Sequence, residues 1–337
     1  MNRREILLGG AALAACSREA ESQAPPAPFA MRRGVNLGNA LEAPKEGDWG
    51  YRIEPAHLIA ISNAGFDGIR VPIRWDLHAD ADGNVRPDFL IRVAAIVDQG
   101  LALDLKVQLD CHHYEGLIVN PNAERARFLN IWRSIAEDLQ DAPPNLIFEP
   151  LNEPNGARWT GAFLRTLQRD VIEVIREHNP NRLIVLGPSQ WQNIDALHDW
   201  RPPEDRNIAV SVHYYEPHAF THQNAPWMAN APNFGREWGT NADHDRVRQQ
   251  VRAAASWAQT QGYPMQLGEF GVNRAVPIQQ RAAWTRTVRE ACEANGMAWC
   301  AWDFAGAFPV WDRERREMIP QMQEALFGVV EDRLGER

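Results

Sequence analysis

The feature that most limits the fold is a regular alternation of short apolar runs with longer amphipathic stretches, which extends over residues 34–329. This alternation is typical of βα units around a parallel sheet, because strands covered on both faces read as short apolar runs. Eight such runs are predicted as strands: residues 34–39, 68–75, 106–113, 145–152, 182–187, 208–215, 265–270 and 297–303. Eight strands close a barrel, so we predict an α/β protein with a single (β/α)8 TIM barrel domain over residues 31–337.

Helical patterns fill the intervals between these runs, and Gly or Pro follows several of them where a helix should stop. The predicted helices are residues 54–64, 88–99, 122–141, 161–178, 243–261, 277–294 and 319–329, with a short helix within 190–200. Residues 216–240 have no periodicity and follow the sixth strand, where barrel enzymes commonly carry a substrate-binding loop.

The N-terminal residues have the layout of an export signal. Arg3-Arg4 precedes an apolar run over residues 6–15, which is too short to span a bilayer, and Cys16 follows. Leu13-Ala-Ala-Cys16 resembles a lipobox, so residues 1–16 predict a signal that ends in lipidation of Cys16. Residues 17–30 are rich in Ala, Pro, Glu and Ser and predict a flexible tether. We expect export by the twin-arginine route and a lipid anchor in the bacterial cell envelope.

The net charge of −9 excludes nucleic acid and anionic membrane as main partners, since phosphate binding needs a basic face. A neutral substrate suits this surface, membrane contact is expected only through the lipid, and we expect a monomer. Cys111, Cys292 and Cys300 remain after Cys16, and they are predicted to be core thiols because they suggest no disulfide framework.

Polar residues close the strand-like runs, and in a barrel such strand ends converge on one active site. Two of them are glutamates in similar settings, Glu153 in Leu151-Asn-Glu-Pro154 and Glu269 in Gly268-Glu-Phe270. The other strand-end candidates are Asn39, Glu42, Arg70, His112, His113, Asn152, His213, Tyr215 and Trp302. Cleavage of a glycosidic bond needs one carboxylic acid and one carboxylate, roughly 5–5.5 Å apart for retention and about 6.5–9.5 Å apart for inversion.

Several motifs together strongly resemble glycoside hydrolase family 5, the cellulase family of clan A. Besides the two glutamate motifs, they are Gly68-Ile-Arg-Val-Pro-Ile-Arg74, Asp110-Cys-His-His-Tyr114 and His213-Tyr-Tyr215. Gly38-Asn-Ala-Leu-Glu-Ala-Pro44, Gly47-Asp-Trp-Gly50 and Phe220-Thr-His-Gln223 resemble its bacterial endo-β-1,4-glucanase branch. The resemblance implies retaining hydrolysis of a β-glucan without cofactor or metal, with Glu153 as acid/base and Glu269 as nucleophile.

The resemblance also implies roles for the other candidates. Arg70 and Tyr215 would hold the Glu269 carboxylate, and Asn152 would bind the sugar 2-hydroxyl. His112 and His213 would position substrate and Glu153, and Trp302 would form a floor under a sugar ring. The remaining predicted sugar-binding residues are Asn39, Glu42, His113, His222 and Trp227.

Alternatives remain open for several of these residues. Arg70 could pair with a buried strand-end acid, His113 could only support His112, and Trp302 could fill the core. Pro150 interrupts a central strand and predicts a bulge, because proline cannot donate to the ladder. The sequence does not decide whether Trp49, Trp159 and Trp191 line the cleft or pack in the core.

Three other functions are compatible with the sequence. The nearest is cleavage of β-mannan, alone or together with glucan. A metal-dependent barrel hydrolase would use the histidines near the strand ends, namely His112, His113, His213, His218 and His222. A catalytically inactive, surface-tethered carbohydrate-binding protein is the third.

Overall fold

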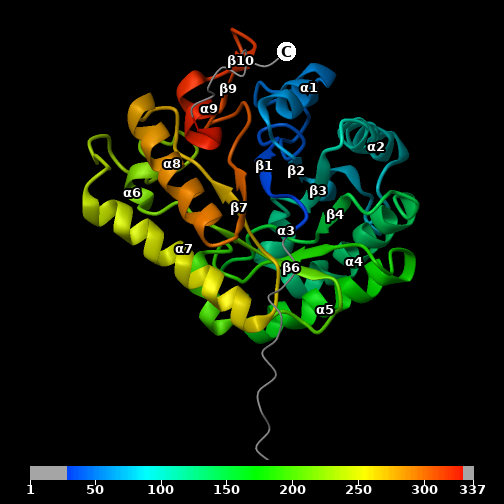
Figure 1. The fold of residues 1–337 in the computed structure, drawn as a ribbon. Coiled ribbons are helices and arrows are strands. Elements are labelled where there is room, and N and C mark those ends of the chain that lie inside the picture. The colour runs from blue at the N-terminus through cyan, green and yellow to red at the C-terminus, as the bar shows by residue number, and fades with distance from the viewer. Residues whose placement is uncertain (1–28, 329–337) are drawn as a thin grey trace, which may run out of the picture.

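The computed structural model describes residues 29–328. Eight parallel strands form a closed barrel in which each strand pairs with the next and β8 pairs with β1 (Figure 1). The strands are β1 (Arg33–Asn36), β2 (Gly68–Ile73), β3 (Lys106–Cys111), β4 (Leu146–Glu149), β5 (Ile184–Leu186), β6 (Ile208–His213), β7 (Met265–Phe270) and β8 (Ala298–Ala301). The predicted (β/α)8 barrel is confirmed. The predicted export signal and most of the tether lie outside the described residues.

The helices surround the barrel, and α7, α8 and α9 follow one another along one side of it (Figure 1). They are α1 (Pro55–Ala64), α2 (Pro87–Ala102), α3 (Glu115–Val119), α4 (Pro121–Asp138), α5 (Gly161–His178), α6 (His218–Thr221), α7 (Asn241–Gln261), α8 (Ile278–Ala294) and α9 (Pro320–Phe327). Two 3-10 helices, η1 (Trp75–His78) and η2 (Ile194–Asp199), and a hairpin of β9 (Trp311–Asp312) and β10 (Glu317–Met318) complete the described part. Four of these elements were not predicted from the sequence: η1, α3, α6 and the hairpin.

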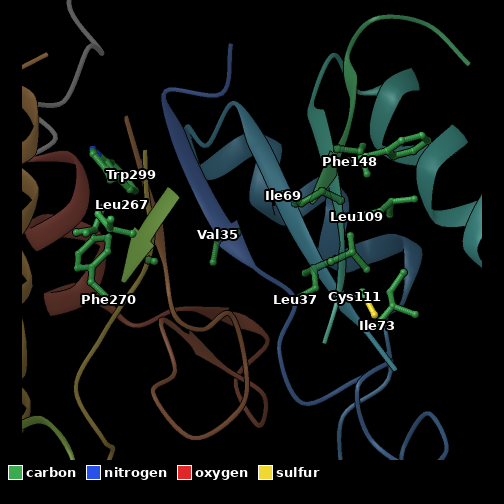
Figure 2. Close-up of a cluster of buried hydrophobic side chains, with 14 of the residues drawn as sticks. Val35, Leu37, Ile69, Ile73, Leu109, Cys111, Phe148, Leu267, Phe270 and Trp299 are labelled. Carbon is green, nitrogen blue, oxygen red and sulfur yellow. The ribbon is translucent and has the colours of Figure 1, made fainter. Parts of the chain in front are cut away.

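The outer faces of the strands form the main hydrophobic core with the helices. Alternate residues along each strand point outward, and Ile69, Leu109 and Phe148 are fully buried there (Figure 2). On the other side of the barrel, Leu267 and Phe270 pack near Trp299, whose ring lies 6.1 Å from that of Phe270 (Figure 2). This double coverage explains why the strands read as apolar runs.

The inside of the barrel has two layers of opposite character. One is apolar and is a small cluster of its own, made of Phe29, Met31, Ile147, Val185, Ala209, Ala298 and Cys300. The other is polar although no more than 4% exposed, and it includes Asn36, Arg70, Gln108, Asp110, Glu149, Ser211, Gln266 and Glu269. Buried polar groups of this kind need hydrogen-bond partners, and here they find them in one another.

The bulge predicted at Pro150 is not observed. β4 ends at Glu149, and its pairing with β3 has no register shift, so Pro150 lies just beyond the strand. Contact with β3 resumes when the N–H of Asn152 donates to the carbonyl of Cys111 at 3.0 Å. The chain therefore accommodates the missing N–H by interrupting the strand at Pro150 and Leu151.

The three cysteines of the described part are free and buried, as predicted: Cys111, Cys292 and Cys300. None of the helices within residues 29–328 combines the length and the hydrophobicity that a bilayer crossing requires.

Candidate active site

A bulge in β7 points Glu269 into the barrel. Leu267 pairs with Val212 of β6, but the next pair is Glu269 with His213, so Gly268 is the extra residue. Without this extra residue, the alternation would place Glu269 on the outer face. Only glycine fits here, because a Cβ at Gly268 would lie 2.3 Å from Ser211 Oγ.

Glu153 comes from the loop that follows β4. Its backbone is left-handed, with φ of 47°, a conformation that costs a non-glycine residue free energy. Its N–H donates to the Gln192 side chain at 2.7 Å, which fixes the peptide that carries the glutamate. The side chain is 27% exposed, so this carboxyl group faces the open end of the barrel.

The two glutamates lie close together with His213 between them. One ligand atom from each of the three, Glu153, His213 and Glu269, can be chosen so that all lie within 4.8 Å of one another. His213 Nδ1 lies 2.7 Å from Glu153 Oε1 and 3.6 Å from Glu269 Oε2. At least one oxygen of each carboxyl group is therefore within 4.8 Å of an oxygen of the other.

Glu269 is held by two further donors. Arg70 Nη1 donates to Oε1 at 2.7 Å, and the Tyr215 hydroxyl donates to Oε2 at 2.9 Å. The Glu269 side chain is only 5% exposed, so both contacts are shielded from solvent. They fix the orientation of the carboxylate and favour its charged form.

Arg70 is the centre of a buried charge network below the two glutamates. Its guanidinium contacts Glu149 at 2.6 Å, Asp110 at 3.0 Å and Asn152 Oδ1 at 2.7 Å, in addition to Glu269. The alternative that Arg70 pairs with a buried acid is thus realised together with its contact to Glu269. Its planar fork of five N–H groups makes this possible, because a lysine could not bridge so many acceptors.

The pKa values of both glutamates are raised by burial. Burial raises the pKa of Glu153 to about 7, against the lowering effect of Arg70, and the negative Glu149 adds to the rise. Burial likewise raises the pKa of Glu269 to about 7, with His213 and Arg70 acting in the opposite direction. Burial keeps the pKa of His213 below its usual value, so this imidazole is neutral near pH 7.

A second group of predicted residues lies beside the pair. His112 is buried, its Nδ1 lies 3.1 Å from Asp110 Oδ1, and its Nε2 lies 3.4 Å from Asn152 Nδ2. Its ring stacks on Trp302 at 5.5 Å and 8°, and Trp302 keeps part of its surface exposed. His113 is exposed and packs edge-on against His112. Trp302 is therefore a partly open aromatic surface rather than core filler.

The remaining predicted residues lie around this centre. His222 packs edge-on against Tyr215 at 5.0 Å, and Trp227, 53% exposed, lies 5.7 Å from Phe308. Asn39 donates to Asp303 Oδ2 at 2.9 Å. Glu42 is only 1% exposed, and its two carboxylate oxygens accept the N–H groups of residues 39 and 40, so its observed contacts hold the loop. A sugar contact of Glu42 stays a prediction.

The three undecided tryptophans have different positions. Trp159 is 3% exposed, belongs to the core and donates to the carbonyl of Ile118 at 2.9 Å. Trp49 is 45% exposed and faces His113 edge-on at 6.1 Å. Trp191 is 57% exposed, and its backbone N–H donates to the carbonyl of Pro154 at 3.4 Å, next to Glu153. Trp49 and Trp191 are thus available beside the site, while Trp159 packs.

Sequence reasoning missed four buried residues that shape the site: Asp110, Glu149, Gln192 and Asp303. For Asp110 and Glu149 a signal existed, since each is an acid inside an apolar run at an inward position. Gln192 gave no signal, because its side chain reaches Glu153 only through the tertiary fold.

Glu153, His213 and Glu269 are also the one group of His, Cys, Asp and Glu side chains in residues 29–328 with the spacing of metal ligands. Of the five histidines predicted for a metal-dependent hydrolase, only His213 belongs to this group, and four do not join it, namely His112, His113, His218 and His222. The predicted histidine cluster is therefore not assembled in the described part.

A closed parallel barrel with two adjacent glutamates at one end defines the class, the barrel-type glycoside hydrolases. Within this class, the family model Cellulase (glycosyl hydrolase family 5) matches residues 33–307. The chain belongs to glycosyl hydrolase family 5, which confirms the family and enzyme class predicted from the sequence.

Relatives agree with this assignment. Endoglucanase H of Acetivibrio thermocellus is 31% identical over 313 residues, which are 89% of this chain and 33% of that protein. Endoglucanase A of Clostridium longisporum is 28% identical over 81% of this chain and 58% of its own length. The chain thus spans between a third and three fifths of these two relatives.

Solved structures are similar over nearly their whole length. Thermotoga maritima Cel5A in complex with cellobiose has a TM-score of 0.85 and 35% identity, covering 88% of this chain and 97% of that one. The same enzyme in complex with mannotriose gives the same values. Cellulose synthase subunit Z from Clostridioides difficile has a TM-score of 0.85 and 34% identity, covering 88% and 99%.

Proposed function

We propose that the protein is a retaining endo-acting hydrolase of β-1,4-glucan, either cellulose or mixed-linkage β-glucan. The observation that carries the proposal is the closeness of the Glu153 and Glu269 oxygens, within 4.8 Å. At this separation one carboxylate reaches the sugar carbon directly, and no water fits between. The endoglucanase names of the relatives support the choice of substrate.

In the first step, Glu269 attacks the anomeric carbon as Glu153 gives its proton to the departing glycosidic oxygen. The bond to the leaving sugar breaks, and a covalent glycosyl ester forms on Glu269. In the second step, Glu153 takes a proton from a water molecule, which attacks the same carbon and frees Glu269. Two inversions retain the configuration.

This division of roles follows from where one proton rests on the pair. Two close carboxyl groups resist ionising together, so one of them keeps a proton near neutral pH. Glu269 receives N–H and O–H donors from Arg70 and Tyr215, which stabilise its charge. The Glu153 carboxyl group contacts only His213. Burial raises the pKa of both glutamates to about 7, so the donors on Glu269 decide which of the two carries the proton. The proton therefore rests on Glu153, as a general acid requires.

The neighbouring residues would bind the sugar next to the cleaved bond. Asn152, fixed by Arg70, would hold the 2-hydroxyl, a contact that strengthens in the transition state. Trp302 would support the apolar face of a ring, with His112 stacked behind it. Outer contacts would come from Asn39, Glu42, His113, His222 and Trp227.

Initial rates on carboxymethylcellulose, barley β-glucan, mannan and xylan test the substrate. We expect the two glucans to be cleaved fastest, with internal cuts that lower viscosity early. Proton NMR of the first product tests the stereochemistry and should show the β-anomer. A first product in the α-form would contradict direct attack by Glu269.

Mannan is the second candidate substrate, alone or together with glucan. It is favoured by the structural similarity to Thermotoga maritima Cel5A, whose solved complexes include one with mannotriose and one with cellobiose. Glucose and mannose differ at the 2-hydroxyl, the group assigned to Asn152. A strong preference for mannan over both glucans would replace the first choice.

Two remote alternatives have direct tests. A metal-dependent hydrolase would lose activity in EDTA, whereas a two-carboxylate mechanism is unaffected by chelation. A non-catalytic carbohydrate-binding protein would turn over none of the four polysaccharides.

We also propose that the protein is exported by the twin-arginine route and anchored by a lipid on Cys16, acting as a monomer in the cell envelope. The proposal depends on the sequence of residues 1–16, with residues 17–30 as a tether. Radiolabelled palmitate should label the full-length protein and should not label Cys16→Ser. Light scattering of the soluble domain should give the monomer mass.

A further inference from the structure

Gln192 lies beneath the active site in an unusual stretch of backbone. Gln190, Trp191 and Gln192 all have positive φ, of 59°, 58° and 50°. Side chains other than glycine rarely adopt this region, and three such residues in succession are costly. Gln192 is also fully buried, at 0% exposure, and it does not reach the surface that would contact substrate.

Three polar groups of Gln192 each contact a different part of the site. Its side-chain oxygen accepts the N–H of Glu153 at 2.7 Å, and its side-chain nitrogen donates to Glu149 Oε1 at 3.3 Å. Its main-chain carbonyl accepts the N–H of His213 at 2.8 Å. One residue thus holds the backbone of Glu153 and the backbone of His213, whose imidazole lies 2.7 Å from the Glu153 carboxyl group.

The fold makes room for this side chain. Gly187 follows β5, and a Cβ there would lie 2.3 Å from the Gln192 side-chain nitrogen. Glu149 in turn pairs with Arg70 at 2.6 Å, and Arg70 contacts Glu269 at 2.7 Å. A continuous path of hydrogen bonds therefore connects the backbone of Glu153 with the carboxylate of Glu269 through the barrel interior.

We propose that Gln192 is a positioning residue, which sets the direction in which Glu153 presents its proton without touching the substrate. The inference rests on the proposed function of Glu153 as acid/base. An amide is suited to the task, because it accepts from the Glu153 N–H and donates to the Glu149 carboxylate at once. Glu153 has a left-handed backbone, so loss of its N–H contact lets the peptide relax and turns the carboxyl group away.

Leaving-group dependence tests the proposal. The variant Gln192→Met keeps the length of the side chain and removes both hydrogen bonds. We expect kcat/KM on cellotetraose to fall by about 10²-fold, the size of effect that a misplaced catalytic group produces. kcat/KM on 2,4-dinitrophenyl β-cellobioside should stay near the wild-type value, because this leaving group departs without protonation. This constant reports steps up to the glycosyl-enzyme, so the later use of Glu153 as a base does not enter.

Gln168→Met is the matched control. Gln168 is also buried, at 5% exposure, and contacts the Gly187 carbonyl and the Trp200 indole, with no bond to Glu153. We expect both rate constants to stay at the wild-type level in this variant. A general loss of folded protein would lower the apparent kcat/KM on both substrates by the same factor. Equal losses in Gln192→Met, or no loss on either substrate, would overturn the proposal.

A second variant covers the case in which Gln192→Met does not fold. Gln192→Glu keeps an oxygen for the Glu153 N–H, so we expect it to retain more activity on cellotetraose than the Met variant. If the Met variant does not fold, Gln192→Glu decides. A loss of kcat/KM on cellotetraose with no loss on the dinitrophenyl substrate supports the proposal, and equal losses contradict it.

Glu153→Ala separates the positioning role of Gln192 from the acid/base role of Glu153. If it shows the leaving-group pattern and neither Gln192 variant does, the positioning role fails while the proposed function stands. If Glu153→Ala lacks the pattern, the acid/base role itself fails.

Discussion

The ends of β4 and β7 each present a glutamate, and the chain holds the two differently. Glu269 lies within its strand, 5% exposed, and receives donors from Arg70 and Tyr215. Glu153 lies beyond its strand in a left-handed conformation, 27% exposed, and is held mainly through its backbone. Glu269 is fixed at its carboxylate, whereas Glu153 is fixed at its backbone N–H.

This difference matches two kinds of chemistry. A nucleophile must be charged and aimed at one carbon, which fixed donors on the carboxylate accomplish. An acid/base must gain and lose a proton, and donors on its oxygens would lock it in the charged form. Holding Glu153 through its N–H leaves His213 as the contact of its carboxyl group, so the group can change protonation while the direction of the side chain is kept.

The largest expected effect comes from removing the proposed nucleophile. Glu269→Ala should lower kcat on β-glucan on the order of 10⁵-fold, because no covalent intermediate can form. Added azide should restore turnover and give the α-glycosyl azide, detected by NMR. Unchanged thermal unfolding would show that the variant folds, and near-normal activity in it would contradict the role of Glu269.

A smaller loss is expected at the other glutamate. Glu153→Ala should lower kcat/KM on β-glucan by about 10²- to 10⁴-fold, the usual contribution of general acid catalysis. On 2,4-dinitrophenyl β-cellobioside the same constant should change little, and azide should give the β-glycosyl azide. Opposite azide anomers from Glu269→Ala and Glu153→Ala would establish that the two glutamates have different roles. The same anomer from both variants would refute this.

Tyr215 tests whether donors on the Glu269 carboxylate matter. Tyr215→Phe removes one hydrogen bond to a charged group, worth about 1.5–3 kcal/mol, so kcat should fall by about 10- to 100-fold. Tyr214→Phe is the control, since the neighbouring hydroxyl donates to Gln250 at 2.8 Å on the outer side of the barrel. Comparable losses in both variants would point to a packing effect.

How far the sequence predicts these two regions depends on the range of the forces involved. The eight strands are visible because burial on both faces is a local property of each run. Glu153 and Glu269 could be proposed because each ends such a run within a recognisable motif. The pairing of Arg70 with three carboxylates could not be predicted, since it depends on how closure of the barrel brings β2, β3, β4 and β7 together.

Local departures of the backbone from regular geometry also could not be predicted from the sequence. The bulge at Gly268 decides which face Glu269 occupies, yet a strand of this length reads the same with or without it. The left-handed residues 190–192 carry no glycine to announce them. In both places tertiary contacts hold a conformation that local preferences oppose, and both places support the active site.

The smallest expected effect is on the pH dependence, and it separates the two glutamates most directly. Glu153 must be protonated for the first step, and its pKa is raised to about 7. kcat/KM on cellotetraose should therefore fall above about pH 7, as Glu153 loses its proton. Glu153→Gln cannot ionise, so its residual kcat/KM on cellotetraose should stay level over the same alkaline range. Tyr215→Phe should instead shift the acidic limb upward, because removing a donor from the Glu269 carboxylate raises its pKa. An alkaline limb that persists in Glu153→Gln would assign that ionisation to another group and remove the distinction between the two strand ends.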